Sequence, residues 1–300
     1  MPLPRRTALA ALLFSLLLAP VAAMASPASQ AAPVAAAADA CTAPLMAVSS
    51  SGQMTHTWAG TDGSFYRDPL WSGLPRLSFQ PRGLAFAYSS TTGPADVYYA
   101  LGPQGYLWRV GVLGQGTQRR VAYAAVPGRW DGVRDIAVVG RSLYLLTASG
   151  LLQRRPITGT GGLGAAVTLR ADQGATSSLS AGGYYATPGP DGRLGASYQV
   201  LYGITGDGRL QQHLVRVAGT AGQPLRLSTL LGAGWNRFDS VDVGACSDGR
   251  GLAYFGRDRA TGWVLSYRDA NGYDGRGSDI AYTGSLGPLP DRTYGSGQPY

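Results

Sequence analysis

The sequence predicts an all-β protein: a five-bladed β-propeller with about 50 residues per blade, closed where the two ends of the chain meet. Three observations support this fold class. A strand–turn–strand pattern recurs five times, an aromatic-led segment precedes several of the copies, and strong helix formers are scarce. All 25 basic residues are Arg and all 17 acidic residues are Asp, beside 44 Gly and 17 Tyr. Lys and Glu favour helices whereas Asp and Gly favour turns, so this composition indicates β structure.

The recurring pattern is a hairpin in which a turn ending in glycine joins two apolar strands. Its copies read THTWAGTDGSFYRD, VYYALGPQGYLWRV, SLYLLTASGLLQRR, VLYGITGDGRLQQHL and LAYFGRDRATGWVLSY. The turn glycines are Gly63, Gly105, Gly150, Gly208 and Gly262. One such repeat cannot bury both faces of its own sheet, whereas five repeats around an axis bury each face against a neighbour. An open β-sandwich or a solenoid is the alternative.

In a second pattern an aromatic residue is followed by one apolar residue three positions later and by another six positions later. Its copies are Trp71-Leu74-Leu77, Trp130-Val133-Ile136, Trp235-Phe238-Val241 and a looser one that runs from Tyr273-Asp274-Gly275 to Asp279-Ile280. The fourth repeat, near residues 177–179, lacks the ring. The pattern therefore marks four of the five predicted blades.

These repeats resemble the tachylectin-2 family, in which a W-x-x-F-x-x-V segment is followed by an Asp-Gly turn, L-x-Y and a second glycine turn. The matching segments are GAGWNRFDSV (Gly232–Val241) and RWDGVRDIAVVGRSLYLLTASGLLQR (Arg129–Arg154). The resemblance extends from about Pro44 to Ser285. It implies a five-bladed propeller lectin that binds N-acetylated amino sugars. The chain departs from the family pattern in its unequal repeats, its single Trp-Asn pair and the missing aromatic.

The two ends of the chain lie outside the predicted propeller, which spans residues 41–287. Residues 1–25 are predicted to be a secretory signal peptide. The segment has two positive residues, Arg5 and Arg6, then an apolar run, and it ends in the small residues of Ala23-Met24-Ala25. An uncleaved anchor is the alternative. Residues 26–40 predict a disordered Ala/Pro-rich tether, and residues 288–300 a flexible tail. The mature protein is thus expected to be extracellular or periplasmic, without a membrane span.

Cys41 and Cys246 are the only cysteines, and two cysteines in an exported chain predict one disulfide. They fall in the first and fifth repeats, which are neighbours in a closed ring. The bond would fasten the seam, and the segment Tyr273–Tyr282 is expected to add a strand across it.

The sequence offers no recognisable catalytic constellation. His56 and His213 lie in predicted strands of different hairpins, and no spacing of His or Cys suits zinc. No Gly-x-Ser-x-Gly and no phosphate-binding loop occurs. Glycosidases place two carboxylates across the bond they cleave, commonly with a Glu, and this chain has none. We therefore expect no enzyme activity, no cofactor and no metal, with a glycan hydrolase as the weaker alternative.

The charge also bears on possible partners. Loss of Arg5 and Arg6 with the signal peptide would lower the formal net charge of +8 by two, to +6. No basic cluster accompanies this excess, so nucleic acid is not an expected partner.

Rings beside polar side chains are the candidate carbohydrate sites. A ring can stack on the apolar face of a sugar while Asp or Asn binds its hydroxyls. The candidates are Trp130 with Asp131, Trp235 with Asn236, Tyr273 with Asp274, and Trp71 as a weaker copy. The alternative is that these rings only fill the space between blades. The expected function is glycan binding, of the N-acetylglucosamine or N-acetylgalactosamine type that the resemblance implies, and a protein-interaction platform is the competing interpretation.

Overall fold

A computed structural model describes residues 40–68, 76–89, 95–114, 118–170, 175–188, 194–217, 226–249 and 251–295. All of them belong to one compact unit. The predicted signal peptide, nearly all of the tether, and Trp71 lie outside the described residues. Within the described ranges no helix has the length and apolar character needed to cross a membrane.

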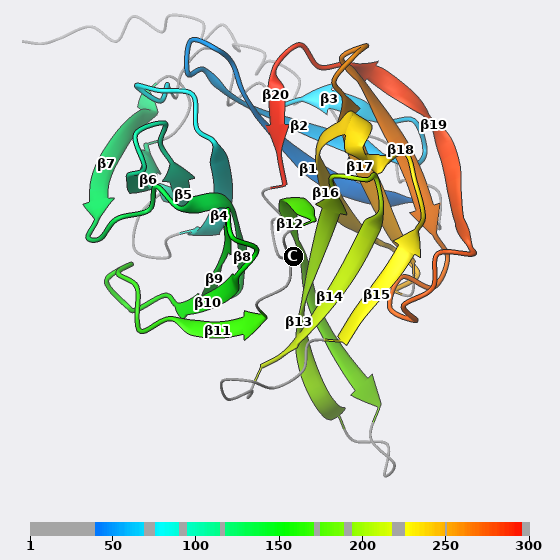
Figure 1. Cartoon of the computed structure of the whole chain (residues 1–300). Helices are drawn as coiled ribbons and strands as arrows, with labels where there is room; N and C mark the ends of the chain where they lie inside the picture. Colours follow the sequence, from blue (N-terminus) through cyan, green and yellow to red (C-terminus); the bar gives the residue numbers. More distant parts are fainter. Residues whose placement is uncertain are drawn as a thin grey trace, which may run out of the picture. The chain divides into compact units, whose positions relative to one another are not determined.

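The described structure is all-β, and three of its sheets have four antiparallel strands each in chain order (Figure 1). Repeat 2 holds β4 (Gly83–Ser89), β5 (Ala95–Leu101), β6 (Leu107–Leu113) and β7 (Arg120–Val126). Repeat 3 holds β8 (Val133–Val139), β9 (Ser142–Thr147), β10 (Leu152–Pro156) and β11 (Val167–Arg170). Repeat 4 holds β12 (Thr176–Pro188), β13 (Leu194–Thr205), β14 (Leu210–Arg216) and β15 (Arg226–Leu231).

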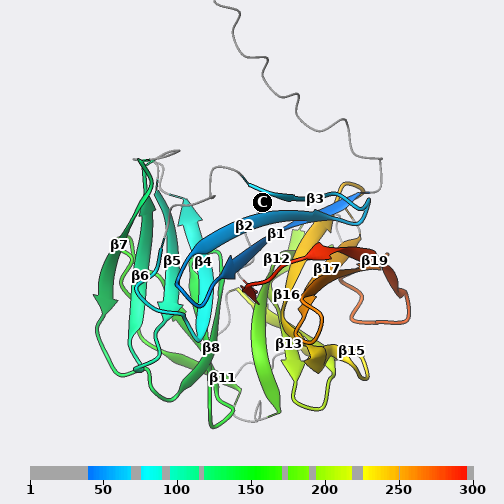
Figure 2. The same ribbon diagram turned by 90° about the horizontal axis from the view of Figure 1, so that it is seen from above.

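The fourth sheet has eight strands and joins the two ends of the described chain. Repeat 5 supplies β16 (Phe238–Cys246), β17 (Leu252–Asp258), β18 (Trp263–Asp269) and β19 (Ile280–Pro288). Repeat 1 supplies β1 (Cys41–Val48), β2 (Met54–Gly60), β3 (Phe65–Arg67) and β20 (Arg292–Tyr294). Strand β1 pairs with β16 at one end and with β20 at the other (Figures 1 and 2).

The predicted disulfide is present, because Cys41 and Cys246 face each other across the β1–β16 pair and are bonded. Two expectations about the C-terminal region differ from the structure. Residues 288–300 were expected to form a flexible tail, yet Arg292–Tyr294 is β20. The strand that the C-terminal region adds to β1 is β20 and not the segment Tyr273–Tyr282. The last residues of that segment begin β19, which pairs with the outer side of β18.

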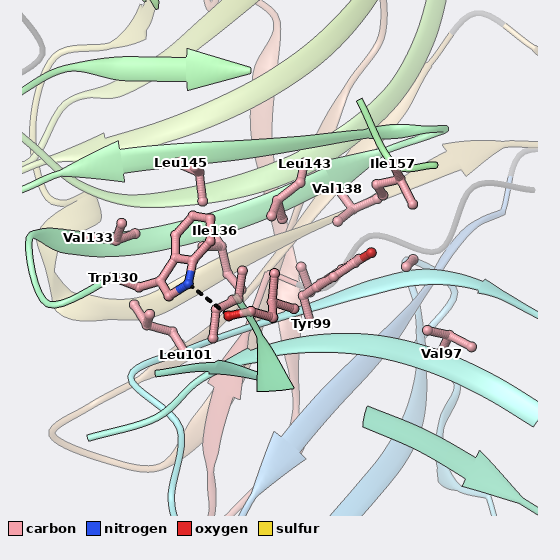
Figure 3. Close-up of a cluster of buried hydrophobic side chains, with 14 residues drawn as sticks. Val97, Tyr99, Leu101, Trp130, Val133, Ile136, Val138, Leu143, Leu145 and Ile157 are labelled. Carbon is pink, nitrogen blue, oxygen red and sulfur yellow. Dashed lines mark hydrogen bonds between the residues drawn. The ribbon is translucent and has the colours of Figure 1, made fainter. Parts of the chain in front are cut away.

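Buried side chains from alternate positions join each repeat to its neighbours. In β5, Tyr99 packs with repeat 3 whereas the adjacent Tyr98 packs with repeat 1, because successive residues of a strand point to opposite faces. Five such clusters occur among the described residues, and they join repeats 1 and 2, 2 and 3, 3 and 4, 4 and 5, and 5 and 1. Figure 3 shows the cluster between repeats 2 and 3.

A backbone hydrogen bond recurs where one repeat leads into the next. The N–H groups of Leu77, Trp130, Trp235 and Leu289 donate to the carbonyl oxygens of Gly52, Gly105, Gly208 and Gly262, at 2.8, 3.0, 2.9 and 2.8 Å. All four donors are buried. The approach is so close that a Cβ added at Gly52 would lie 2.0 Å from the Leu77 carbonyl oxygen, and one added at Gly105 would lie 2.7 Å from the Asp131 Cβ. Glycine is therefore required at Gly52 and Gly105.

This contact corrects the first predicted repeat. The sequence places its turn at Gly63 and its ring at Trp71, whereas Gly52 and Leu77 have these places in the structure. The reason is that β20, from the far end of the chain, supplies the first strand of repeat 1. The β1–β2 hairpin, and not β2–β3, is consequently the equivalent of β5–β6.

The fully buried His213 in β14 leads to a prediction about acid stability. Burial, followed by the charge of Arg170, lowers its pKa to about 4. Since the folded pKa is below the unfolded value of about 6.5, stability is lost as the pH falls from about 6.5 towards 4, by about 3 kcal/mol in all. Urea unfolding of the parent at pH 7 and near pH 4.5 should show this loss, and His213→Leu should show much less of it. Equal pH dependence in the two proteins would contradict the assignment to His213.

Candidate functional site

A pocket of about 520 Å³ lies over the outer strands of repeat 5. Its lining residues are Arg237, Thr261, Trp263, Leu265, Tyr267, Tyr282 and Ser285. Three rings, four hydroxyl groups and one guanidinium group therefore meet in one concavity.

Strand periodicity gives the pocket its aromatic wall. Trp263, Leu265 and Tyr267 are alternate residues of β18 and share one face, while Val264 between them is buried on the other. Tyr282 in β19 is the register partner of Tyr267, and their rings lie 5.5 Å apart in an edge-to-face arrangement. Trp263 is 44% exposed and Tyr282 is 56% exposed. Large rings with this much exposure offer a ligand apolar faces that remain in water.

The polar wall is Arg237, the last residue of the short 3₁₀ turn η3 (Trp235–Arg237). Its Nε and Nη2 groups donate to Asp258, whose carboxylate is buried. The other Asp258 oxygen accepts the N–H groups of Ala260 and Thr261. Burial acts to raise the pKa of Asp258, but the hydrogen bonds from Arg237 and these N–H groups outweigh it and lower the pKa. The half-exposed guanidinium is thus held in one orientation by an ionised carboxylate.

Trp235 lies under this wall and does not face solvent. It is 3% exposed, and its ring packs 4.9 Å from Tyr267 and 5.4 Å from Phe238. The Asn236 amide donates to the carbonyl oxygen of Gly206 at 3.1 Å. The pair that the sequence selects for sugar contact is therefore absent from the pocket lining, and the next residue, Arg237, lines it instead. Packing, the alternative that the sequence left open, accounts for Trp235.

The other predicted rings lie at separate places. Trp130 is 4% exposed in the cluster between repeats 2 and 3, where its Nε1–H donates to the Val126 carbonyl oxygen at 3.2 Å (Figure 3). Its neighbour Asp131 is exposed. Tyr273 stacks on Tyr185 of repeat 4, with 4.8 Å between ring centres.

Asp274, beside Tyr273, is exposed, and its Oδ1 accepts the N–H of Arg276. Trp71, the remaining candidate ring, lies outside the described residues. Trp130, Trp235 and Tyr273, the predicted rings that the structure describes, therefore lie at separate places, and a stacking role for the buried Trp130 conflicts with its packing.

Trp263 and Tyr282 were missed because the sequence search favoured the residues before each first strand. A signal was nevertheless present, since Trp263 directly follows the turn glycine Gly262 and alternates with Leu265 and Tyr267. Such a strand has an aromatic stripe on one face. Repeat 2 has a similar stripe, since Tyr106 follows Gly105 and alternates with Trp108. In repeats 3 and 4 the residue after the turn glycine is Leu151 or Arg209, so the stripe separates repeats 2 and 5 from these two.

Among the described residues no group of three or more His, Cys, Asp or Glu side chains could hold a metal ion. No carboxylate of the described chain is part of the pocket lining either. The pocket chemistry is therefore that of stacking surfaces, hydroxyl groups and a guanidinium donor.

No family model and no curated protein matches the chain. The chain is similar to several solved structures. A triple mutant of AofleA from Arthrobotrys oligospora is 16% identical, with a TM-score of 0.45 over 80% of this chain and 68% of that one. The BP39L lectin from Burkholderia pseudomallei is 15% identical, with a TM-score of 0.42 and coverages of 84% and 66%. The periplasmic gluconolactonase PpgL from Pseudomonas aeruginosa is 13% identical, with a TM-score of 0.29 and coverages of 81% and 82%. Sequence identities of 16% or less and TM-scores below 0.5 do not transfer a function to this chain, so the function is inferred from the pocket.

Proposed function

We propose that the protein binds carbohydrate, without catalysis, in the pocket of repeat 5. The observation that carries this proposal is the pair of exposed rings, Trp263 and Tyr282, beside an Arg237 guanidinium of fixed orientation. A pyranose has apolar C–H faces that stack on rings and hydroxyl groups that accept hydrogen bonds from guanidinium. Because Asp258 neutralises Arg237, the pocket suits a neutral sugar. N-acetylated amino sugars, which the tachylectin-2 resemblance implies, are the first ligands to test.

The absence of carboxylates from the pocket lining favours binding over hydrolysis, since glycoside hydrolysis commonly uses two carboxyl groups. A glycan array of the mature protein, followed by calorimetry with N-acetylglucosamine and N-acetylgalactosamine, tests the proposal. If no soluble sugar binds, the proposal fails and a protein-interaction platform becomes the better interpretation.

We infer that the repeats form a closed five-bladed propeller. The five buried clusters support this inference, because each joins two successive repeats and one joins repeat 5 to repeat 1. The hydrogen bond between Leu289 and Gly262 supports it too. Leu289 precedes β20 and contacts the turn of repeat 5, just as Trp130 precedes β8 and contacts the turn of repeat 2. We expect that not every blade binds sugar, because repeats 3 and 4 lack the exposed aromatic stripe of repeat 5.

Replacement of Arg237 by lysine is expected to weaken sugar binding about tenfold. Lysine keeps a positive charge near Asp258 but loses the planar fork that presents several donors at once. Calorimetry measures the affinity, and thermal melting shows whether the fold is retained. Arg259→Lys is the matched control, because Arg259 is also about half exposed and paired with an Asp, yet lies outside the pocket lining. Equal losses in the two variants would show that Arg237 does not contact sugar.

We also propose that the protein is exported and cleaved after Ala25, as Ala23-Met24-Ala25 predicts. The disulfide supports an oxidising compartment. N-terminal sequencing of secreted protein should start at Ser26 or within the Ala-rich tether. Mature protein that still carries Met1 would contradict the processing.

A further inference from the structure

Two pockets share the Tyr88 side chain as a wall, one lined by repeat 2 and the other lined by Tyr88 and residues of repeat 3. One has a volume of about 370 Å³ and is lined by Tyr88, Val97, Arg109, Gly111, Leu113, Ala122, Tyr123 and Ala124. The other has about 280 Å³ and is lined by Tyr88, Gly140, Arg141, Ile157, Thr158 and Gly159. We call the two together the Tyr88 groove. It is separate from the pocket of repeat 5, with which it shares no residue.

The groove has the features of a surface that receives sugar rings. Gly111, Ala122 and Ala124 give the larger pocket a lining of very small side chains, and Gly140 and Gly159 do the same in the smaller one. Tyr88 is 36% exposed between them. Small side chains beside an exposed ring leave space for a flat ligand unit on either side of that ring.

The loop between β10 and β11 fixes one side of the groove. The Tyr99 hydroxyl donates to the Gly161 carbonyl oxygen at 2.8 Å, and the Arg109 guanidinium donates through Nη1 to the Thr160 carbonyl oxygen. Gly161 has φ +74°, and a Cβ there would lie 2.5 Å from Arg109 Nη1 and 3.3 Å from the Tyr88 hydroxyl. Arg109 and Tyr88 therefore meet at this glycine, and the Arg109 side chain lines the larger pocket.

The groove is positively charged and not neutralised. No acidic side chain lines either pocket, and neither Arg109 nor Arg141 has a carboxylate partner among the described residues. Asp96 is close in sequence, but it precedes Val97 in β5 and so points to the opposite face, where its charge acts on His56 and Tyr98. The pocket of repeat 5 differs, because Asp258 neutralises Arg237 there.

We propose that the Tyr88 groove is a second binding site, which takes an acidic oligosaccharide with a carboxylate-bearing sugar in each pocket. Arg109 and Arg141 bind the two carboxylates, since guanidinium and carboxylate groups match in geometry as well as charge. Tyr88 lies between the two sugar rings and contacts both. The protein would thus hold a neutral sugar on repeat 5 and an acidic chain that extends from repeat 2 to repeat 3.

Calorimetry of the mature protein with tetragalacturonate tests the site, with the methyl-esterified tetramer as the neutral control ligand. We expect the acid to bind and the ester not to bind measurably. Arg109→Gln should weaken binding of the acid about tenfold or more, since a hydrogen bond to a charged group contributes about 1.5–3 kcal/mol. Arg141→Gln, at an exposed position where folding is not at risk, should also weaken it by several fold.

Arg120→Gln is the matched control, because Arg120 is exposed on neighbouring β7 and lines neither pocket. It removes the same charge and should leave the affinity within about twofold. The proposal is overturned if the acid does not bind, if Arg120→Gln weakens binding as much as Arg109→Gln, or if Arg141→Gln has no effect. Loss of acid binding in Trp263→Ala would also overturn it, by placing the acid in the repeat 5 pocket. Arg109→Gln should still bind neutral sugar, which would show that the repeat 5 pocket is intact and that only the Tyr88 groove has been changed.

Discussion

Trp263→Ala is expected to reduce the affinity for neutral sugar at least about thirtyfold, which corresponds to about 2 kcal/mol. Trp263 supplies the largest exposed ring of the repeat 5 pocket, and stacking on a sugar requires that ring. Its side chain is 44% exposed, so the melting temperature should change little. Calorimetry or the fluorescence change on sugar titration measures the effect.

Two further variants separate stacking from packing. Tyr66→Ala removes a ring that is 49% exposed on β3, outside the pocket, and should bind sugar as the parent does. Trp235→Ala removes a buried ring and should destabilise the fold by about 3–5 kcal/mol. Full sugar binding by Trp263→Ala would exclude this ring as the stacking surface.

Joint replacement of Cys41 and Cys246 by alanine is expected to lower the free energy of unfolding by about 4–5 kcal/mol, because the bond closes a very long loop. The two cysteines are 205 positions apart in the sequence. The bond matters here because β1 and β16 pair at only two positions, Cys41 with Cys246 and Thr42 with Ala245. Thermal melting should show a midpoint lower by about 10–20 °C.

The parent measured under reducing conditions serves as the control for packing. It keeps both buried sulfur atoms and loses only the covalent link, so its midpoint should fall most of the way to that of the double variant. If reduction leaves the midpoint unchanged, the cross-link contributes little and the stability of the β1–β16 pair has another source.

The sequence was most informative where the pattern is local. Hairpins around Gly105, Gly150, Gly208 and Gly262 could be placed because a turn glycine and period-two strands are visible within a few residues. The pairing of Cys41 with Cys246 followed from their repeats. The first repeat could not be placed in this way, since its first strand, β20, comes from the opposite end of the chain.

The functional residues were harder to predict because exposure depends on the neighbouring repeat. Trp235 and Trp263 are both aromatic residues beside a glycine, yet one is 3% exposed and the other 44%. The local sequence marks Trp263 as part of an alternating strand but does not show which of the two rings is covered by its neighbours. The difference arises because Trp235, in η3, packs against Tyr267, whereas Trp263 is the first residue of β18 and lies on the face that lines the pocket.

The pairing of β20 with β1 also determines when folding of the chain can be completed. Strands β1 to β3 leave the ribosome early, but their sheet lacks a strand until Arg292–Tyr294 has been synthesised. Contacts between such distant parts of a chain form slowly, because a long loop must close first. A nascent chain therefore cannot complete the sheet of repeat 1 until its last strand has been synthesised, so this sheet is the last to gain all of its strands.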